Sequence, residues 1–287
     1  MPARVCPPVG AHVRVGGGLA RGGLAYAARV GAEAVQVFAS NPRGWAASPG
    51  DPRQDEAFRH GCAERGWPVF VHAPYLVNLG SPDAVTVRRS VAALRHALSR
   101  AGALGARGVV VHTGSAVDEA HRPAALRQVR RQLRPLLDRL PEDGPDLLLE
   151  PTAGQGRSLC ASVPELGEYL DLLDRHPKVG VCLDTCHVFA AGADLTAPGA
   201  VGRLLAELEA VAGAGRLRLV HANDAKDGCG SQRDRHENIG AGRIGLAPFR
   251  ALLRHRALRG VPVVVETPGG AEGHAADVAT LRRLRDR

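Results

Sequence analysis

The segment Val220–Gly245 concentrates imidazole and carboxylate side chains in one glycine-rich stretch. His221 ends the short apolar run that precedes it, and Asp234 and His236 follow on what we expect to be a flexible loop. Imidazole nitrogens and carboxylate oxygens are ligands that zinc takes in proteins, and the same donors serve manganese and iron. The segment by itself is also typical of a solvated polar loop, so the metal interpretation depends on the rest of the chain.

Short apolar runs alternate with longer segments throughout the sequence, and we expect each of these runs to be a β-strand. Several are continuously apolar, as in Val109–Val111 and Val263–Val265, which is typical of parallel strands buried on both faces. The expected strands are Val9–Val13, Ala34–Phe38, Val69–His72, Gly108–His112, Asp146–Glu150, Val179–Asp184, Leu217–His221 and Val261–Glu266.

The segments between these strands carry helix signals. Val91–Leu104 and Leu126–Leu140 have apolar residues at helical intervals. Ser81–Asp83 offers an N-cap serine, a first-turn proline and an acid, and Ser162 and Glu165 have the spacing of a capping box. Eight strand-then-helix units without a linker predict an α/β fold, a single (β/α)8 TIM barrel over residues 1–287. A doubly wound sheet is the alternative, but no Gly-x-Gly-x-x-Gly follows the first strand.

The ends of the expected strands carry groups that could do chemistry. Barrel enzymes place their active sites at the C-terminal strand ends, where eight segments converge on one mouth. Burying such groups without partners costs several kcal/mol each, and bound metal ions would offset that cost. His187, three residues after Asp184, would add a further ligand. The groups at or near the strand ends are His12, His72, His112, Glu150, Asp184, His221 and Glu266.

The remaining histidines and the cysteines have simpler interpretations. His12 either supports a ligand or packs in the core, and Cys182 and Cys186, which flank Asp184, are interpreted as packing residues. None of the six cysteines forms a C-x-x-C pair and no signal peptide is recognisable, which favours reduced thiols in a cytoplasmic protein. We expect surface or helix-capping positions for His60, His96, His121, His176, His255 and His274.

The formal net charge of +8 is compatible with an anionic partner, nucleic acid first. Almost all basic residues are arginines, with Lys178 and Lys226 as the only lysines. A genome-wide codon bias would give the same composition, so the charge supports nucleic-acid binding only weakly. No apolar run approaches the roughly 20 residues that span a bilayer, and we expect no membrane association.

Nearly the whole chain, from Gly10–Val13 to Glu266–Pro268, resembles endonuclease IV, the zinc-dependent apurinic/apyrimidinic endonuclease family of base-excision repair. The segments that carry the resemblance occur in the family's order. They are Asn41–Arg43 with Trp45, Val71–Leu79, Val111–His112 with Gly114–Ser115, Leu149–Glu150 with Thr152–Gly156, Cys182–His187, Asn223–Asp224 and Asp234–Gly240.

The resemblance implies three zinc ions per chain, with manganese or iron as possible substitutes. All nine positions that match the family's ligands keep their residue type in this sequence. The implied groups are His72, His112 and bridging Glu150 for the first ion, Glu150, Asp184, His221 and Glu266 for the second, and His187, Asp234 and His236 for the third.

The implied reaction is hydrolysis of the phosphodiester bond 5′ to an abasic site in double-stranded DNA. It leaves a 3′-hydroxyl and a 5′-deoxyribose phosphate, and a metal-activated bridging water attacks without a protein nucleophile. Glu150 and Glu266 are the implied catalytic residues in a monomeric cytoplasmic enzyme. The residues implied to contact DNA are Arg43, Tyr75, Leu76 and Arg235.

Some positions depart from the family's usual residues, and two alternative functions remain. Gly44 and Gln232 stand where the family usually has Gln and Arg, in segments that resemble its DNA-contacting loops, and Thr113, Pro151 and Ala241 also differ. A metal-dependent sugar isomerase or epimerase would use the same barrel, but the third ligand group argues against it. A protein that only binds damaged DNA would have no use for a metal cluster.

Overall fold

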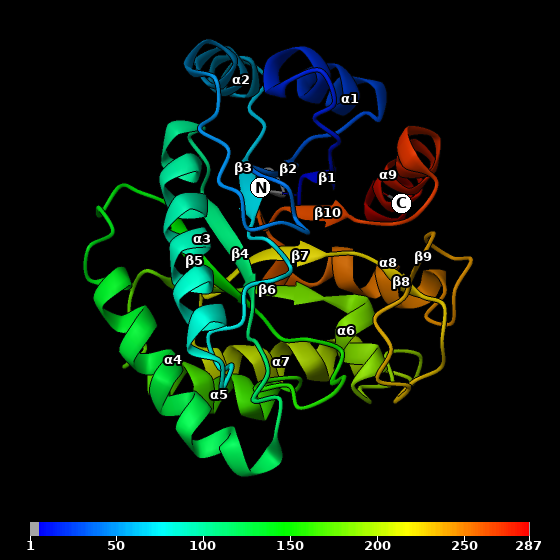
Figure 1. The fold of residues 1–287 in the computed structure, drawn as a ribbon. Helices are drawn as coiled ribbons and strands as arrows, with labels where there is room; N and C mark the ends of the chain where they lie inside the picture. Colours follow the sequence, from blue (N-terminus) through cyan, green and yellow to red (C-terminus); the bar gives the residue numbers. More distant parts are fainter. Residues whose placement is uncertain (1–5, 287) are drawn as a thin grey trace.

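The computed structural model of the protein describes residues 6–286. Within this part of the chain, eight parallel strands close into a barrel that helices surround (Figure 1). The closed barrel confirms the predicted α/β TIM-barrel fold. Its strands are β1 (Val9–His12), β2 (Val35–Phe38), β3 (Val69–His72), β4 (Gly108–His112), β5 (Asp146–Glu150), β6 (Val179–Asp184), β7 (Leu217–His221) and β10 (Val263–Val265).

A second, two-stranded antiparallel sheet lies outside the barrel and consists of β8 (Asp224–Ala225) and β9 (His236–Glu237). Short turns of π- and 3-10 helix at Leu19–Gly23, Glu119–His121 and Arg256–Leu258 accompany the longer helices. The α-helices are α1 (Leu24–Arg29), α2 (Pro52–Glu64), α3 (Ala84–Ala103), α4 (Arg122–Leu137), α5 (Val163–Leu172), α6 (Thr185–Ala190), α7 (Ala200–Ala212), α8 (Leu246–Arg254) and α9 (Gly270–Asp286). No helix among residues 6–286 has both the length and the apolar character that crossing a membrane requires.

Strands β3 to β7 begin and end where the sequence predicts, whereas β1 ends one residue before the predicted Val13 and β2 begins one residue after the predicted Ala34. The last strand is shorter than the predicted Val261–Glu266 at both ends. Val261 N donates to Leu258 O at 3.1 Å in a turn, and Pro262 has no N–H to give to a neighbouring strand. At the other end, Glu266 N donates to Asn223 Oδ1 at 2.8 Å. Glu266 therefore follows β10 directly instead of ending it.

The helix starts were predicted with mixed success. The capping box of Ser162 and Glu165 is present at the start of α5. The predicted N-cap at Ser81 is wrong, because Asp83 caps α3 by accepting hydrogen bonds from Val85 N and Thr86 N. Ser81 Oγ accepts from Asp83 N and so supports the capping residue from two positions earlier in the chain.

Inward-facing side chains form two layers in the barrel, because residues two apart on a strand point to the same face. The residues between them join the larger core that lies between the barrel and its helices. The lower layer is apolar and consists of Ala34, Phe70, Val110, Leu148, Cys182, Leu219 and Val264. Two residues beyond each of these stand Gln36, His72, His112, Glu150, Asp184, His221 and Glu266.

His12 takes the corresponding place on β1, two residues beyond Gly10. A side chain at Gly10 would collide with the backbone of Ala34, since a Cβ there would lie 1.7 Å from Ala34 O. We call His12 and the seven side chains named last the polar ring. Strand periodicity thus places one polar side chain from each of β1 to β7, together with Glu266 just after β10, in a single layer above the apolar one.

Of the simpler sequence interpretations, the one for Cys182 agrees with the structure and the one for His274 does not. Cys182 lies in the apolar layer, as a packing residue would. The prediction for His274 was wrong: it is buried in α9, with Nδ1 3.1 Å from the Tyr26 hydroxyl and Nε2 2.8 Å from Thr267 O. Periodicity alone could not show that this face of α9 packs against the barrel.

Candidate metal centre

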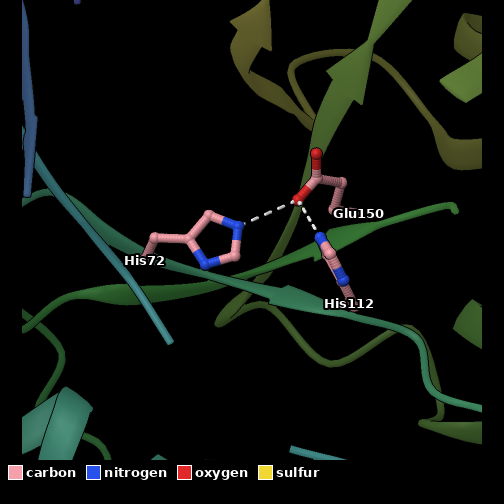
Figure 2. Close-up of side chains that lie close together, drawn as sticks. All are labelled: His72, His112 and Glu150. Carbon is pink, nitrogen blue, oxygen red and sulfur yellow. Dashed lines mark ion pairs between the residues drawn. The ribbon is translucent and has the colours of Figure 1, made fainter. Parts of the chain in front are cut away.

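The first group of predicted ligands comes from three adjacent strands. Glu150 Oε2 lies 3.3 Å from His72 Nε2 and 3.3 Å from His112 Nε2, and Figure 2 shows the two imidazoles approaching that one oxygen. His72 Nδ1 is 2.6 Å from Ala73 O, so it donates there and leaves Nε2 free to ligate. Glu150 Oε2 is buried and has no hydrogen-bond partner among residues 6–286. Three donor atoms that converge without hydrogen bonding fit a cation between them.

The second group surrounds His221, which is fully buried. Its Nδ1 lies 2.8 Å from Glu150 Oε1, 3.3 Å from Glu266 Oε2 and 3.8 Å from Asp184 Oδ2. Three carboxylates around one imidazole in a buried site need compensating positive charge, because unpaired buried charges are costly. Glu150 belongs to both groups, with one oxygen directed at each.

The third group lies beside the strand ends and consists of His187, Asp234 and His236. Asp234 Oδ1 is 3.2 Å from His187 Nε2 and 3.1 Å from His236 Nε2. His236 Nε2 is also 3.7 Å from Asp184 Oδ2, which links this group to the second. Shared carboxylates therefore join all three groups into one centre.

Local structure explains the position of His187. Asp184 ends β6 and is the N-cap of α6, where its side chain accepts a hydrogen bond from His187 N at 2.9 Å. The first turn of α6 thus returns His187 to the side of the carboxylate that precedes it. His187 Nδ1 lies 3.1 Å from Pro151 O, which leaves Nε2 directed at Asp234.

The segment that carries Asp234 and His236 is only in part the loop that the sequence predicts. Asp234 lies in a stretch without regular secondary structure, whereas His236 stands on β9, which pairs with β8. The carboxylate of Asp224 accepts hydrogen bonds from Gly240 N, Ile244 N and Gly245 N and holds the segment after β9 in place. Asp224 is therefore occupied by backbone amides and is not among the residues whose donor atoms converge.

The electrostatics of the centre favour positive charge among its carboxylates. Burial favours the neutral acid at Glu266, but the charge of His221 and the hydrogen bond from His12 hold its pKa well below the usual range. Burial likewise opposes ionisation of Asp234, and His187 and His236 again hold that pKa low. Burial disfavours charge on His236, yet Asp184 and Asp234 raise its pKa to about 9. Divalent cations would satisfy the same demand that imidazolium protons satisfy here.

Two polar residues that sequence reasoning did not select support these groups. Gln36 Nε2 lies 2.6 Å from Glu266 Oε1, and Gln36 Oε1 lies 2.9 Å from His221 Nε2. Asn223 Nδ2 donates to Asp184 Oδ2 at 2.7 Å, while its Oδ1 accepts from Glu266 N. Gln36 could have been found from strand alternation, since it is the one polar residue in the strand Val35–Phe38 and faces inward.

His12 belongs to none of the three ligand groups, but it contacts Glu266, a member of the second. Its Nδ1 lies 3.0 Å from Glu266 Oε1 and 3.0 Å from Gln36 Nε2. Of the two interpretations left open for His12, support of a ligand matches this contact. Cys182 and Cys186 also lie near the ligands, but burial raises both thiol pKa values, that of Cys182 to about 12. Neutral thiols are poor metal ligands.

Three of the predicted DNA contacts lie on neighbouring loops at the mouth. Tyr75 N donates to Pro42 O at 3.0 Å, which joins the loop after β3 to the loop that carries Arg43. Tyr75 is 46% exposed, and its ring meets that of His72 edge to face at 5.4 Å. Leu76 is half-buried and Arg43 is exposed. These side chains can reach a molecule that covers the first ligand group.

The fourth predicted DNA contact, Arg235, is differently placed. Its guanidinium forms an ion pair with Asp227, with Nε 2.6 Å from Asp227 Oδ2. Arg235 is next to Asp234 in the chain, but its charge is already compensated. Its role in DNA binding stays a prediction.

A cavity of about 630 Å³ opens beside Glu266. Its lining includes His12, Phe38, Asn41 and Tyr75, so it lies between the polar ring and the loops that carry the exposed Tyr75 and Arg43. Pockets of roughly 300–1,000 Å³ are typical of small-molecule sites. The space is adequate for one sugar-phosphate unit next to the ligand groups.

Comparison with known proteins identifies relatives over almost the full length. Residues 24–284 match a protein family described as "Xylose isomerase-like TIM barrel". The "Probable endonuclease 4" of Streptomyces coelicolor is 61% identical over 280 residues, which cover 97% of this chain and 95% of the relative. The crystal structure of endonuclease IV from Thermus thermophilus superposes with a TM-score of 0.81 at 33% identity and covers 97% of this chain and 98% of its own.

A more distant likeness extends to sugar-converting enzymes. A D-tagatose 3-epimerase-like protein has a TM-score of 0.67 at 19% identity, with 88% of each chain covered. At that identity, the likeness shows the barrel fold alone.

Proposed function

This chain belongs to the endonuclease IV family, and on that premise we propose that it hydrolyses the phosphodiester bond on the 5′ side of abasic sites in duplex DNA. The products are a 3′-hydroxyl and a 5′-deoxyribose phosphate. The observation that carries the proposal is the convergence of three ligand groups, joined by the carboxylates of Glu150 and Asp184, at one barrel mouth. All three groups are complete within one chain, so the proposal includes a monomeric enzyme, and its reduced thiols fit the cytoplasm.

The groups would hold three divalent cations, zinc by preference and manganese or iron as substitutes. Mixed imidazole and carboxylate donors with fixed histidine tautomers are what such ions require. When bound, the cations supply Lewis acidity at the phosphodiester and lower the pKa of water. Each cation would be held by one of the three ligand groups described above.

Glu266 is placed to prepare the attacking water. Gln36 Nε2 and His12 Nδ1 hold its Oε1, while Oε2 faces the second ligand group. Because its pKa is depressed, Glu266 remains an ionised acceptor at neutral pH and can orient a water molecule through a hydrogen bond. The thiols of Cys182 and Cys186 are neutral, so neither provides a nucleophile that would compete with water.

The abasic nucleotide must leave the helix to reach the polar ring. Extrusion costs a few kcal/mol and is cheapest where the base is already missing. The cavity beside Glu266 offers room for the extruded sugar phosphate. Tyr75 lines this cavity, and Arg43 and Leu76 follow the lining residues Pro42 and Tyr75 in the chain. Their side chains are of kinds that can stack in a gapped duplex.

A sugar isomerase or epimerase is the competing function on the same fold. Such an enzyme would be served by the first two ligand groups. The third group, His187, Asp234 and His236, adds a further site directly beside them. An additional cation fits phosphodiester hydrolysis, in which charge builds up on the non-bridging oxygens and on the leaving oxygen.

We expect purified active protein to contain close to three metal equivalents, most of them zinc. Elemental analysis and nicking of a duplex with a single abasic site should be measured on the same preparation. The site geometry requires that metal content and nicking fall together during dialysis against a chelator. One equivalent or none in fully active protein would refute the three-metal proposal.

We expect Tyr75→Ala and Arg43→Ala to weaken binding to abasic duplex about tenfold, with metal content and melting temperature nearly unchanged. The reason is that both side chains are exposed and neither supplies a ligand atom, although the Tyr75 ring packs against that of His72. Affinity for intact duplex, which depends mainly on phosphate contacts, should change much less. Equilibrium binding of both duplexes measures the difference.

Arg127→Ala is the matched control for Arg43→Ala, because Arg127 is an exposed arginine on α4, a helix outside the mouth. It should leave the preference for abasic duplex as it is in the wild type. Equal losses for intact and abasic DNA in the Arg43 and Tyr75 variants would identify general phosphate contacts. Early melting would identify packing residues.

A further inference from the structure

Gln36 and His12 are the two members of the polar ring that are neither predicted ligands nor predicted DNA contacts, and of the two only Gln36 contacts both His221 and Glu266. It stands on β2 opposite His12 in the strand register and is completely buried. Burying a primary amide in an apolar strand is costly unless its hydrogen bonds are made. Here both ends of the amide meet groups of the second ligand site.

The two contacts fix the orientation of the amide. An ionised carboxylate can only accept hydrogen bonds, so the group 2.6 Å from Glu266 Oε1 must be the amide nitrogen of Gln36. The amide oxygen is then the atom 2.9 Å from His221 Nε2. Because this oxygen can only accept, His221 must carry a proton on Nε2.

This proton determines which atom of His221 remains for a ligand bond. Nδ1 makes a hydrogen bond of 2.8 Å with Glu150 Oε1 and also faces Asp184 and Glu266, so it is the nitrogen whose proton a cation would replace while Nε2 keeps its proton for Gln36. The same amide holds Glu266 Oε1 and so turns Oε2, 3.3 Å from His221 Nδ1, toward the same point. One side chain thereby orients two ligands.

His221 differs in this respect from three other predicted histidine ligands. His72, His187 and His236 each have Nδ1 near a backbone carbonyl, at 2.6 Å, 3.1 Å and 3.3 Å. Those three present Nε2, and no substitution of a partner side chain would remove the carbonyl that holds them. His221 presents the opposite nitrogen and depends on Gln36 to do so.

We infer that Gln36 is a positioning residue that fixes the tautomer of His221 and the orientation of Glu266, and so prepares the second ligand group to bind its cation. The link to DNA cleavage rests on the proposed function, whereas the link to metal binding does not. Partners of this kind typically contribute 10–100-fold to metal affinity or activity.

The first test replaces Gln36 by methionine, which keeps the volume and removes both hydrogen bonds. Zinc-loaded protein is titrated with the chelator dipicolinate, and the retained zinc is counted at each concentration. We expect one zinc equivalent to leave Gln36→Met at a chelator concentration about 10–100-fold lower than in the wild type. The other two equivalents should leave as in the wild type.

Gln128→Met is the matched control. Gln128 lies on α4, outside the polar ring, and its Nε2 donates to Leu79 O and Ser81 O at 2.9 and 2.8 Å. The substitution thus deletes two side-chain hydrogen bonds of the same kind. It should lower stability to a similar degree while all zinc is retained as in the wild type.

Gln36→Glu separates the two roles of the amide. A carboxylate at this position still accepts from His221 Nε2, but it repels Glu266 instead of donating to it. Long-range proton–nitrogen NMR of the histidine rings in zinc-loaded protein, with His221 identified from a His221→Asn spectrum, should show the wild-type tautomer of His221 in Gln36→Glu. Its nicking of abasic duplex should nevertheless fall at least tenfold.

Wild-type zinc retention in Gln36→Met, or zinc loss that Gln128→Met reproduces, would overturn the inference. A His221 ring that stays protonated on Nε2 in Gln36→Met would also overturn it. If wild-type protein binds zinc but does not nick abasic DNA, the proposed function fails, while the chelator titration still decides the role of Gln36.

Discussion

Replacing Glu150 by glutamine should reduce the zinc content from three equivalents toward one and slow nicking of abasic duplex at least a thousandfold, about 4 kcal/mol of transition-state stabilisation. Glu150 Oε2 faces His72 and His112, and Oε1 faces His221. An amide can offer an oxygen to one of these groups, but its nitrogen then faces the other. The third group, which does not include Glu150, should keep its ion.

Elemental analysis and single-turnover nicking would measure both effects. Glu168→Gln is the control, because Glu168 is an exposed glutamate on α5. It should match the wild type in zinc content and rate. Near-normal zinc in Glu150→Gln would mean that this carboxylate is not shared between two ions.

Glu266→Gln should give a different result: most of the zinc retained, and nicking at least a hundredfold slower, about 3 kcal/mol. Gln36 Nε2 donates to Oε1 of residue 266, so an amide there would keep its oxygen on that side. Its nitrogen would then take the place of Oε2. Glu150, Asp184 and His221 remain to hold the ion, but the acceptor that orients the water is lost.

The comparison of kcat with zinc content tests this assignment. A hundredfold fall in kcat with nearly full zinc supports a role for Glu266 in preparing water. If nicking by Glu266→Gln is close to that of the wild type, another group prepares the water. If zinc and rate fall together, Glu266 acts as a ligand alone.

The barrel strands could be predicted because burial on both faces requires continuously apolar residues along each strand. Runs such as Val69–His72 and Gly108–His112 are apolar up to the histidine that ends each of them, and the structure gives the same bounds. The end of the last strand could not be predicted in this way. A hydrogen bond from Glu266 N to Asn223 Oδ1, made between residues far apart in the chain, ends it early.

The residues that bring the site together were less predictable than the ligands themselves. His187 and Asp234 could be selected by type and resemblance, but the contacts that position them are tertiary. Asp224 illustrates this, since its carboxylate binds backbone amides beyond β9. Gln36 was missed although its signal was local, because a lone amide in an apolar strand has no chemistry of its own.

The composition of the polar ring also depends on the register of the barrel strands. If one strand slipped by a single residue against its neighbour, its chemical group would turn outward and an apolar side chain would take its place. On β4, for example, Val111 would replace His112 in the barrel interior. Cation binding would then favour only the chains in which every ligand-bearing strand is correctly aligned. Zinc uptake during refolding would therefore report when β3 to β7 and β10 are aligned with one another, before any DNA is present.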